Sequence, residues 1–345
     1  MRVLIAGGTG TISTYVTREL VARGDEVVLL NRSGQGGVFA DTAGVTFAAC
    51  DIHNEEQVNA ALRDLPNGAS RQAKFDCVID FIAYTEEDVL RDCRLFGGLT
   101  RQYIFISSAS AYQKPHRSYT VTESTPLHNP YWRYSQEKIA CELALNAKYR
   151  DDGFPVTIVR PSHTYAEKSI PTALHGDNGS YEVIYRIKHG LPVPVPGDGL
   201  TLWTVTHSSD FAKAFVGLVG NMNAVGEAFQ ITSDEALTWN QIYGEIASAI
   251  GGKFMPTYAS SQYLAAFGAK FGYDKDEVLG GLLGDKSNCA VFDNSKIKRF
   301  VPGFVATTPF RAGVRAAVAY IESHPEAQKR DEVFARYCDE LAVSL

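Results

Sequence analysis

Tyr134 and Lys138 are the residues of this sequence best suited by type and spacing to do chemistry. They stand four positions apart, so on a helix their side chains lie on one face, one turn from each other. A phenol has a pKa of ~10 and is a poor base at neutral pH, but a neighbouring ammonium favours the phenolate. Tyr134 is therefore a candidate to take a proton from an alcohol or return one to a carbonyl. Many surface helices carry such a pair by chance, so its surroundings matter.

A run of hydroxyl side chains follows an apolar segment upstream of this pair. Residues 102–107 have the pattern of a buried strand, and Ser107, Ser108 and Ser110 come at its end. Parallel sheets present their active-site groups at the carboxyl ends of their strands. We therefore expect Ser108 to hold a substrate oxygen beside Tyr134, and Ser110 to contact substrate.

A glycine-rich turn lies between the first apolar segment and the helical pattern that starts near Ile12. Gly7, Gly10 and Ser13 follow one another at intervals of three residues, with Ser13 where a dinucleotide-binding turn often has a third glycine. Backbone N–H groups at the start of a helix bind phosphate. The expected contacts to a cofactor pyrophosphate are Gly7, Gly10, Thr11 and Ile12. Tight turns also use glycine without binding anything, so the argument depends on the position of this turn at the start of a βαβ unit.

The ends of the second and third strands predict the adenosine side of the same site. Asn31 and Arg32 follow the second strand, where an acidic residue would bind the ribose of NAD and repel a 2′-phosphate. NADP is therefore favoured and NAD is possible, although Arg32 can also simply close a surface loop. Asp51 and Ile52 suit the adenine, with Asp51 as a helix cap the competing interpretation.

Strand-like and helix-like segments alternate through the first half of the chain, which predicts an α/β fold with a doubly wound, Rossmann-type parallel sheet. After Pro161 the sequence is rich in proline and glycine, and beyond residue 232 it is mainly helical. We expect a dinucleotide-binding domain of residues 1–165 plus about 203–232. A smaller, mainly helical C-terminal substrate domain would contain about 166–202 plus 233–345. The predicted strands and helices are 2–6, 12–23, 26–31, 45–50, 55–65, 77–81, 88–96, 102–107, 131–149, 156–160 and 228–231.

Composition narrows the functional class of these 345 residues. The chain is 45% hydrophobic and 21% charged, without an apolar run near the ~20 residues that a membrane span needs. No signal peptide is recognisable, so a cytoplasmic location is expected. The six cysteines show no metal spacing, and neither a disulfide nor a metal is expected. A net charge of −6 makes nucleic acid an unexpected partner.

The glycine turn, the strand end Ser107-Ser108-Ala109-Ser110, the Tyr134/Lys138 pair and Arg160-Pro161-Ser162 together resemble the extended short-chain dehydrogenases/reductases. The resemblance runs from Met1 to about Val318. Residues 205–212 and 292–296 are similar to a bacterial epimerase/dehydratase branch related to plant chloroplast stem-loop-binding proteins.

The resemblance implies catalytic roles for Ser108, Tyr134 and Lys138, with Lys138 also binding the nicotinamide ribose. It places Pro161 and Ser162 beside the nicotinamide. It further implies a homodimer formed through the helices at 88–96 and 131–149.

One position departs from the nucleotide-sugar epimerases of this family. Trp203 stands where those enzymes usually have an arginine that grips the substrate pyrophosphate. This weakens a nucleotide-sugar assignment and makes Trp203 either a stacking wall for substrate or part of the core. Tyr84, His163 and Tyr165 are further candidates for substrate contact, although a histidine in such a loop is more often structural. Tyr84, which follows the fourth strand, is also expected to cover the cofactor.

The sequence predicts an NAD(P)-dependent oxidoreductase with a Ser-Tyr-Lys site, acting on a small molecule such as a sugar or carbonyl compound. A sugar or nucleotide-sugar epimerase/dehydratase-like activity is the leading hypothesis, and an NADPH-dependent carbonyl reductase is the alternative. An RNA-binding or regulatory protein on a dinucleotide-binding scaffold is the alternative from another class. Net consumption of the cofactor would distinguish the reductase from the epimerase/dehydratase-like enzyme. Salt-sensitive binding of RNA would identify the RNA-binding protein.

Overall fold

A seven-stranded parallel sheet forms the centre of the N-terminal part in the computed structural model, which describes residues 1–32, 37–65 and 75–345. Its strand order is β12-β7-β5-β4-β1-β2-β3, so the chain reverses direction across the sheet between β1 and β4. That reversal opens a crevice at the carboxyl ends of the strands. The strands are β1 (Arg2–Ala6), β2 (Glu26–Asn31), β3 (Val45–Ala49), β4 (Cys77–Asp80), β5 (Tyr103–Ile106), β7 (Val156–Pro161) and β12 (Ala228–Ile231).

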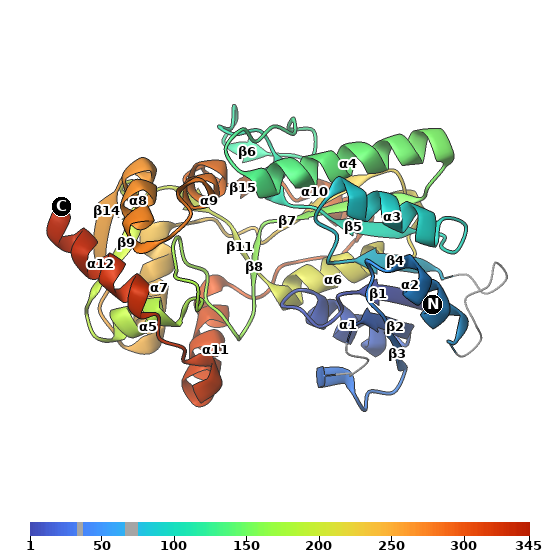
Figure 1. Cartoon of the computed structure of the whole chain (residues 1–345), viewed down its shortest axis with the longest axis horizontal. Helices are drawn as coiled ribbons and strands as arrows, with labels where there is room; N and C mark the ends of the chain where they lie inside the picture. The colour runs from blue at the N-terminus through green and yellow to red at the C-terminus, as the bar shows by residue number, and fades with distance from the viewer. Residues whose placement is uncertain (33–36, 66–74) are drawn as a thin grey trace.

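Alternate residues of these strands face opposite layers of helices, as the pleat of a strand requires. Leu4 and Val28 pack with α2, α3 and α4 in one core, whereas Val3 and Val27 pack with α1 and α6 in the other. Figure 1 shows α3 and α4 on one side of the sheet and α1 and α6 on the other. The helices are α1 (Ser13–Ala22), α2 (Glu55–Arg63), α3 (Glu86–Phe96), α4 (Arg133–Asp152) and α6 (Ser208–Leu218).

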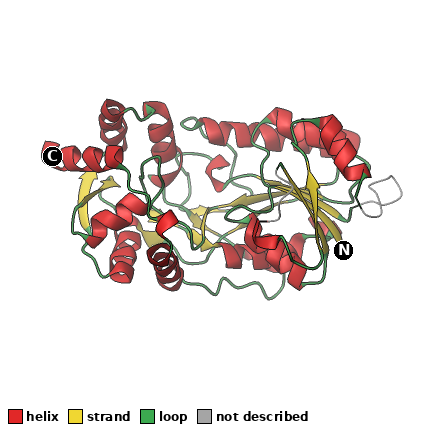
Figure 2. Cartoon of the chain, turned by 60° about the horizontal axis from the view of Figure 1, so that its bottom comes forward, coloured by secondary structure: helices red, strands yellow, loops and turns green. Residues whose placement is uncertain are grey.

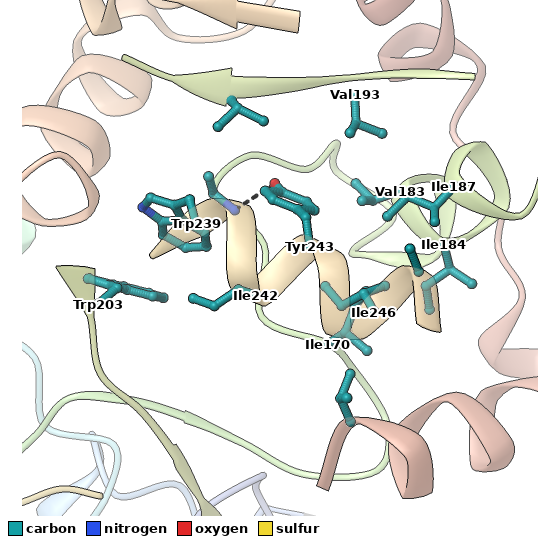
Figure 3. Close-up of a cluster of buried hydrophobic side chains, with 14 of the residues drawn as sticks. Ile170, Val183, Ile184, Ile187, Val193, Trp203, Trp239, Ile242, Tyr243 and Ile246 are labelled. Carbon is teal, nitrogen blue, oxygen red and sulfur yellow. Dashed lines mark hydrogen bonds between the residues drawn. The ribbon is translucent and has the colours of Figure 1, made fainter. Parts of the chain in front are cut away.

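A separate hydrophobic core holds the C-terminal part together. In α7 (Trp239–Ile250) the apolar residues recur every three or four positions, so one face of the helix is buried. Trp239 packs on Trp203, and the Tyr243 hydroxyl accepts a hydrogen bond from the Ala173 amide (3.0 Å), as Figure 3 shows. The other elements around this core are α5 (Tyr181–Lys188), β9 (Pro192–Pro196), β10 (Leu202–Trp203), β13 (Leu237–Thr238), β14 (Met255–Ala259), α8 (Ser261–Gly268), α9 (Lys275–Gly281), α11 (Phe310–Ser323) and α12 (Glu332–Ser344).

Short strand pairs and one helix connect the two parts. β8 (His163–Tyr165) pairs in parallel with β11 (Val205–His207), and β6 (Thr120–Val121) pairs with β15 (Val291–Phe292). Residues 291–304 then return to the sheet, because Ile297 in α10 (Ser295–Phe300) and Phe304 belong to the core under α1 and α6. Figure 2 shows the sheet and the C-terminal helices as neighbouring bodies. The domain boundaries predicted above stay a prediction.

The predicted fold class, a Rossmann-type doubly wound sheet with a mainly helical C-terminal region, is confirmed. Element ends differ by a few residues. The helix that carries Tyr134 and Lys138, for instance, spans Arg133–Asp152 rather than 131–149. It ends at Gly153, whose φ of 68° is the left-handed conformation that closes many helices. Within the described ranges, no helix combines the length and apolar character needed to cross a membrane.

Candidate active site

A cavity of about 250 Å³ opens where β5 and β7 end and α4 begins. Ser108 and Tyr134 line it together, as the sequence predicts. So do Pro161, Ser162 and His163, which come directly from the end of β7. The remaining lining residues are Ile12, Ala109, Ser110, Trp132, Thr164, Trp203, Asp285, Ala290 and Phe292.

Tyr134 lies in the first turn of α4, between the rings of Trp132 (4.9 Å between centroids) and Tyr84 (6.4 Å). Burial raises the pKa of Tyr134 to about 12, while its hydrogen bond with Ser108 acts in the opposite direction. The lowering by Lys138 that the sequence suggested is not seen, because removal from water is the largest effect on this phenol. The phenol is protonated at neutral pH and is ready to act as an acid.

Three serine hydroxyls form a chain that orients Ser108. The Ser135 hydroxyl, on α4, donates to Ser110 Oγ (2.7 Å), and Ser110 Oγ lies 2.8 Å from Ser108 Oγ. Ser108 Oγ also accepts the Ser110 amide (3.1 Å). With Ser110 accepting from Ser135 and donating to Ser108, the Ser108 proton is left to point towards Tyr134 and the cavity. Ser110, predicted as a substrate contact, thus supports Ser108 as well as lining the cavity.

Lys138 is held one turn below Tyr134 with only 2% of its surface exposed. Its ammonium donates to the carbonyls of Ala83 (2.7 Å) and Ile106 (2.8 Å) and lies 4.5 Å from the centroid of the Tyr84 ring. Burial lowers the pKa of Lys138 to about 8. Because an ammonium has three donors and two are used here, one remains for a ligand.

The glycine turn shows why serine replaces the third glycine. The Ser13 hydroxyl donates to the Gly7 carbonyl (2.6 Å) and accepts from the Gly10 amide (2.8 Å), so it ties the turn together. Gly7 has a φ of 78°, and a Cβ there would lie 2.5 Å from Ile82 Cγ2. Only glycine fits this position without displacing the neighbouring segment. Thr11, another of the predicted phosphate contacts, is exposed just before α1 begins at Ser13.

A second cavity, of about 390 Å³, lies on the other side of the glycine turn. It contains the residues predicted for the adenosine, since Asn31, Arg32, Asp51 and Ile52 all line it. Asn54, not Asp51, caps α2 by accepting the Gln57 amide (3.0 Å), which leaves Asp51 to face the cavity. The complete lining is Gly7, Leu30, Asn31, Arg32, Cys50, Asp51, Ile52, His53, Ile82, Tyr84 and Asp88.

These features fit a dinucleotide. Gly7 lines the adenosine-side cavity and Ile12 lines the catalytic cavity, so the glycine turn lies between the two. Tyr84, predicted to cover the cofactor, is half exposed beside Lys138 and Tyr134 and lines the adenosine-side cavity. An adenosine on one side and a nicotinamide on the other would place the pyrophosphate at the start of α1.

The remaining predicted substrate residues have different surroundings. Trp203 belongs to the hydrophobic core and also lines the cavity. Its ring centroid lies 4.5 Å from that of Trp239 and 4.8 Å from that of His163. Burial lowers the pKa of His163 to about 3, so its ring is neutral. Tyr165 is 1% exposed, packs against Phe310, and is not part of the cavity wall.

Sequence reasoning missed two residues of the site. Asn129 donates to the carbonyls of Ser110 (2.8 Å) and Gly284 (2.7 Å), joining the serine loop to the C-terminal part across 155 positions of sequence. Asp285 follows Gly284 in a π-helical turn, Leu282–Lys286, and lines the catalytic cavity. No local pattern marks either residue, since their roles come from contacts between distant segments.

The fold, with a cavity on each side of its glycine turn, is of the extended short-chain dehydrogenase/reductase type. The sequence model of the NAD dependent epimerase/dehydratase family matches residues 3–232. The chain belongs to this family.

Known relatives carry different functions. The chain is 25% identical over 268 residues to the 2'-dehydrokanamycin reductase of Streptomyces kanamyceticus, covering 77% of this chain and 71% of that protein. It is 26% identical over 260 residues to the chloroplast stem-loop binding protein of 41 kDa b of Arabidopsis thaliana, covering 72% of this chain and 63% of that one.

Among solved structures, the UDP-glucose 4-epimerase of Thermus thermophilus in complex with NAD superposes with a TM-score of 0.68. The match covers 93% of this chain and 99% of that chain at 22% identity. At this identity the likeness shows the fold alone.

Proposed function

We propose that this protein is an NADP-dependent oxidoreductase that acts on a carbon–oxygen centre of a sugar ring, with epimerase/dehydratase-like chemistry as the leading assignment. The observation that carries the proposal is that Ser108 and Tyr134 line one cavity beside the glycine turn, with the Lys138 ammonium buried one helical turn from Tyr134. Such a pair of hydroxyls with a buried ammonium is suited to moving one proton to or from an oxygen.

Each of the three residues has a separate task in this proposal. Tyr134, protonated at neutral pH, gives its proton to the oxygen of a carbonyl and takes it back from an alcohol. Ser108 donates a hydrogen bond to the same oxygen, because its own proton is directed into the cavity by Ser110. Lys138 uses its remaining donor to hold the cofactor ribose. A bound nicotinamide supplies or accepts the hydride.

The adenosine-side cavity supports NADP as the cofactor. Arg32 lines this cavity, and Asn31 stands where an acidic residue would repel a 2′-phosphate. A guanidinium is well suited to bind phosphate oxygens in a planar, two-point contact.

A second assignment, reduction of a ketosugar with net use of NADPH, is favoured by one comparison. The relative aligned over 77% of this chain is a reductase of a dehydrogenated kanamycin. The same three residues serve both assignments. What differs is whether the cofactor is regenerated within the catalytic cycle.

The test is a comparison of wild type with Tyr134→Phe, using Tyr131→Phe as the matched control because Tyr131 is 43% exposed and not part of the cavity. NADPH and NADH are titrated by fluorescence, and turnover is measured with 2'-dehydrokanamycin and with unmodified sugars. We expect Tyr134→Phe to bind NADPH like wild type but to lose at least ~100-fold in turnover, the usual size of an acid–base contribution. Wild-type turnover in Tyr134→Phe would refute the catalytic assignment.

The same assay separates the two reactions. A sugar whose stereochemistry changes while NADPH stays constant supports the epimerase-like assignment. NADPH consumed in proportion to product supports the reductase. Equal affinity for NADH and NADPH would remove the NADP preference and leave the catalytic roles intact.

Two expectations of the sequence stay predictions. The homodimer through α3 and α4 would cover Leu143, which is 63% exposed on α4, and the neighbouring Tyr149. The cytoplasmic location likewise remains a prediction.

A further inference from the structure

Asp285 brings a carboxylate to the wall of the catalytic cavity from the C-terminal part of the chain. It lines the same cavity as Ser108 and Tyr134, and its charge is close enough to raise the pKa of Tyr134. The Trp203 side chain is near enough to lower the pKa of the Asp285 carboxyl. Within the described ranges, no salt bridge within 4.0 Å involves Asp285, although the charges of Lys114 and Lys286 are near enough to lower its pKa. Its carboxylate therefore has acceptor capacity left for whatever enters the cavity.

The turn that carries Asp285 is packed rigidly against the start of the catalytic helix. A Cβ at Gly284 would lie 2.8 Å from Trp132 Cβ and 3.0 Å from Asn129 Oδ1, so no larger residue fits there. Asn129 also donates to the Gly284 carbonyl (2.7 Å). The position of Asp285 relative to Tyr134 is thus set by close packing, as recognition of a small substrate requires.

Asp285 is the acidic residue among those that line the cavity, and no lysine or arginine lines it. Burial raises the pKa of the Asp285 carboxyl, and Lys114 and Lys286 act in the opposite direction. Neither lysine lines the cavity, and the Lys114 ammonium contacts His116 Nε2 at 3.0 Å. His163, which does line it, is neutral. A phosphate entering the cavity would therefore meet the Asp285 carboxyl group and no lining ammonium or guanidinium, with Lys114 and Lys286 behind the cavity wall.

The size of the cavity limits what is recognised. About 250 Å³ lies below the ~300–1,000 Å³ usual for pockets that enclose a drug-sized ligand. Because the proposed nicotinamide would share this space, only a small reacting part of the substrate enters it.

We propose that Asp285 recognises the substrate by accepting hydrogen bonds from an unphosphorylated sugar ring, and that it discriminates against a ring that carries a phosphate. The inference rests on the proposed function, because it places the ring beside Tyr134. The donors on the ring are hydroxyl groups or an ammonium, and both bind a carboxylate.

The experiment measures binding by isothermal titration calorimetry to the full-length protein saturated with NADP⁺. The probes are D-glucose, D-glucosamine and D-glucose 6-phosphate, which share one ring and differ in charge. For the wild type we expect the phosphate to bind at least ~10-fold more weakly than glucose, because like charges repel at short range. In Asp285→Asn, which keeps the size of the side chain, the difference should fall below about threefold. Asp198→Asn, which changes an exposed acid outside the cavity, should behave as wild type.

Each outcome decides one point. Tighter binding of glucosamine that disappears in Asp285→Asn identifies an ammonium as the donor, and equal binding of glucosamine and glucose identifies hydroxyls. Wild-type discrimination retained in Asp285→Asn, preference for the phosphate, or no binding of any probe would overturn the role of Asp285. None of these results depends on turnover, so loss of the Tyr134 assignment would be seen separately.

Discussion

Replacing Lys138 by methionine tests whether the buried ammonium beside Tyr134 destabilises the folded protein. Methionine has a similar length and no charge. The ammonium is 2% exposed, and its burial lowers the pKa from the ordinary 10.5 to about 8. At ~1.4 kcal/mol per pKa unit, this is worth about 3 kcal/mol against the folded state when the ammonium is charged in both states.

The sign of the effect fixes the pH window. Below about pH 8 the folded and unfolded chains both bind the proton, so the full destabilisation is present. Between about pH 8 and 10.5 the unfolded chain binds more protons than the folded one, so wild-type stability rises with pH. Lys138→Met lacks this contribution. The variant also loses the two hydrogen bonds from Lys138 to the Ala83 and Ile106 carbonyls. Their loss changes the stability of the variant but does not produce this dependence on pH.

Urea unfolding of both proteins at several pH values between about 7 and 9.5 measures the difference in unfolding free energy. We expect wild type to gain about 2 kcal/mol relative to Lys138→Met between about pH 8 and 9.5. Lys148→Met is the matched control, because Lys148 lies on the same helix and its hydrogen bond to Asp152 raises its pKa. A flat difference between wild type and Lys138→Met would refute the assignment of a disfavoured ammonium at this position.

Two further predictions concern the serine chain and the cofactor. Ser110→Ala should lower kcat by about tenfold through lost orientation of Ser108, with little added loss when Ser108→Ala is already present. Steady-state kinetics of the single and double variants checks this, and additive losses would contradict it. Arg32→Ala should weaken NADPH binding by about 10- to 100-fold and leave NADH within about twofold, which fluorescence titration measures. An equal loss for both nucleotides would argue against a 2′-phosphate contact.

The parts of the site that sequence predicted are those with local patterns. The pair Tyr134 and Lys138 needs only a helix to bring the two side chains onto one face, and the structure supplies it. Ser108 follows from its place at the end of an apolar strand. The glycine turn follows from the backbone conformation that Gly7 adopts, which favours glycine.

Other features depended on distant segments meeting. Whether Asp51 or Asn54 caps α2 was open until the structure showed the Asn54 hydrogen bond. Tyr165 follows the Arg160-Pro161-Ser162 segment in sequence, yet the core of the C-terminal part encloses it. The direction of the Tyr134 pKa also required the structure, because burial is a property of the packed chain.

The sequence by itself determined the parallel α/β architecture, the glycine turn and the spacing that places Tyr134 and Lys138 on one face of a helix. Periodicity, strand ends and short helical spacings carry that information, and all of them are local. Tertiary structure alone decided that Asn129 joins the serine loop to the turn at Gly284, and that Asp285 lines the same cavity as Tyr134. These contacts arise when two separately packed cores close on each other, and no local rule of sequence specifies which distant residues then become neighbours.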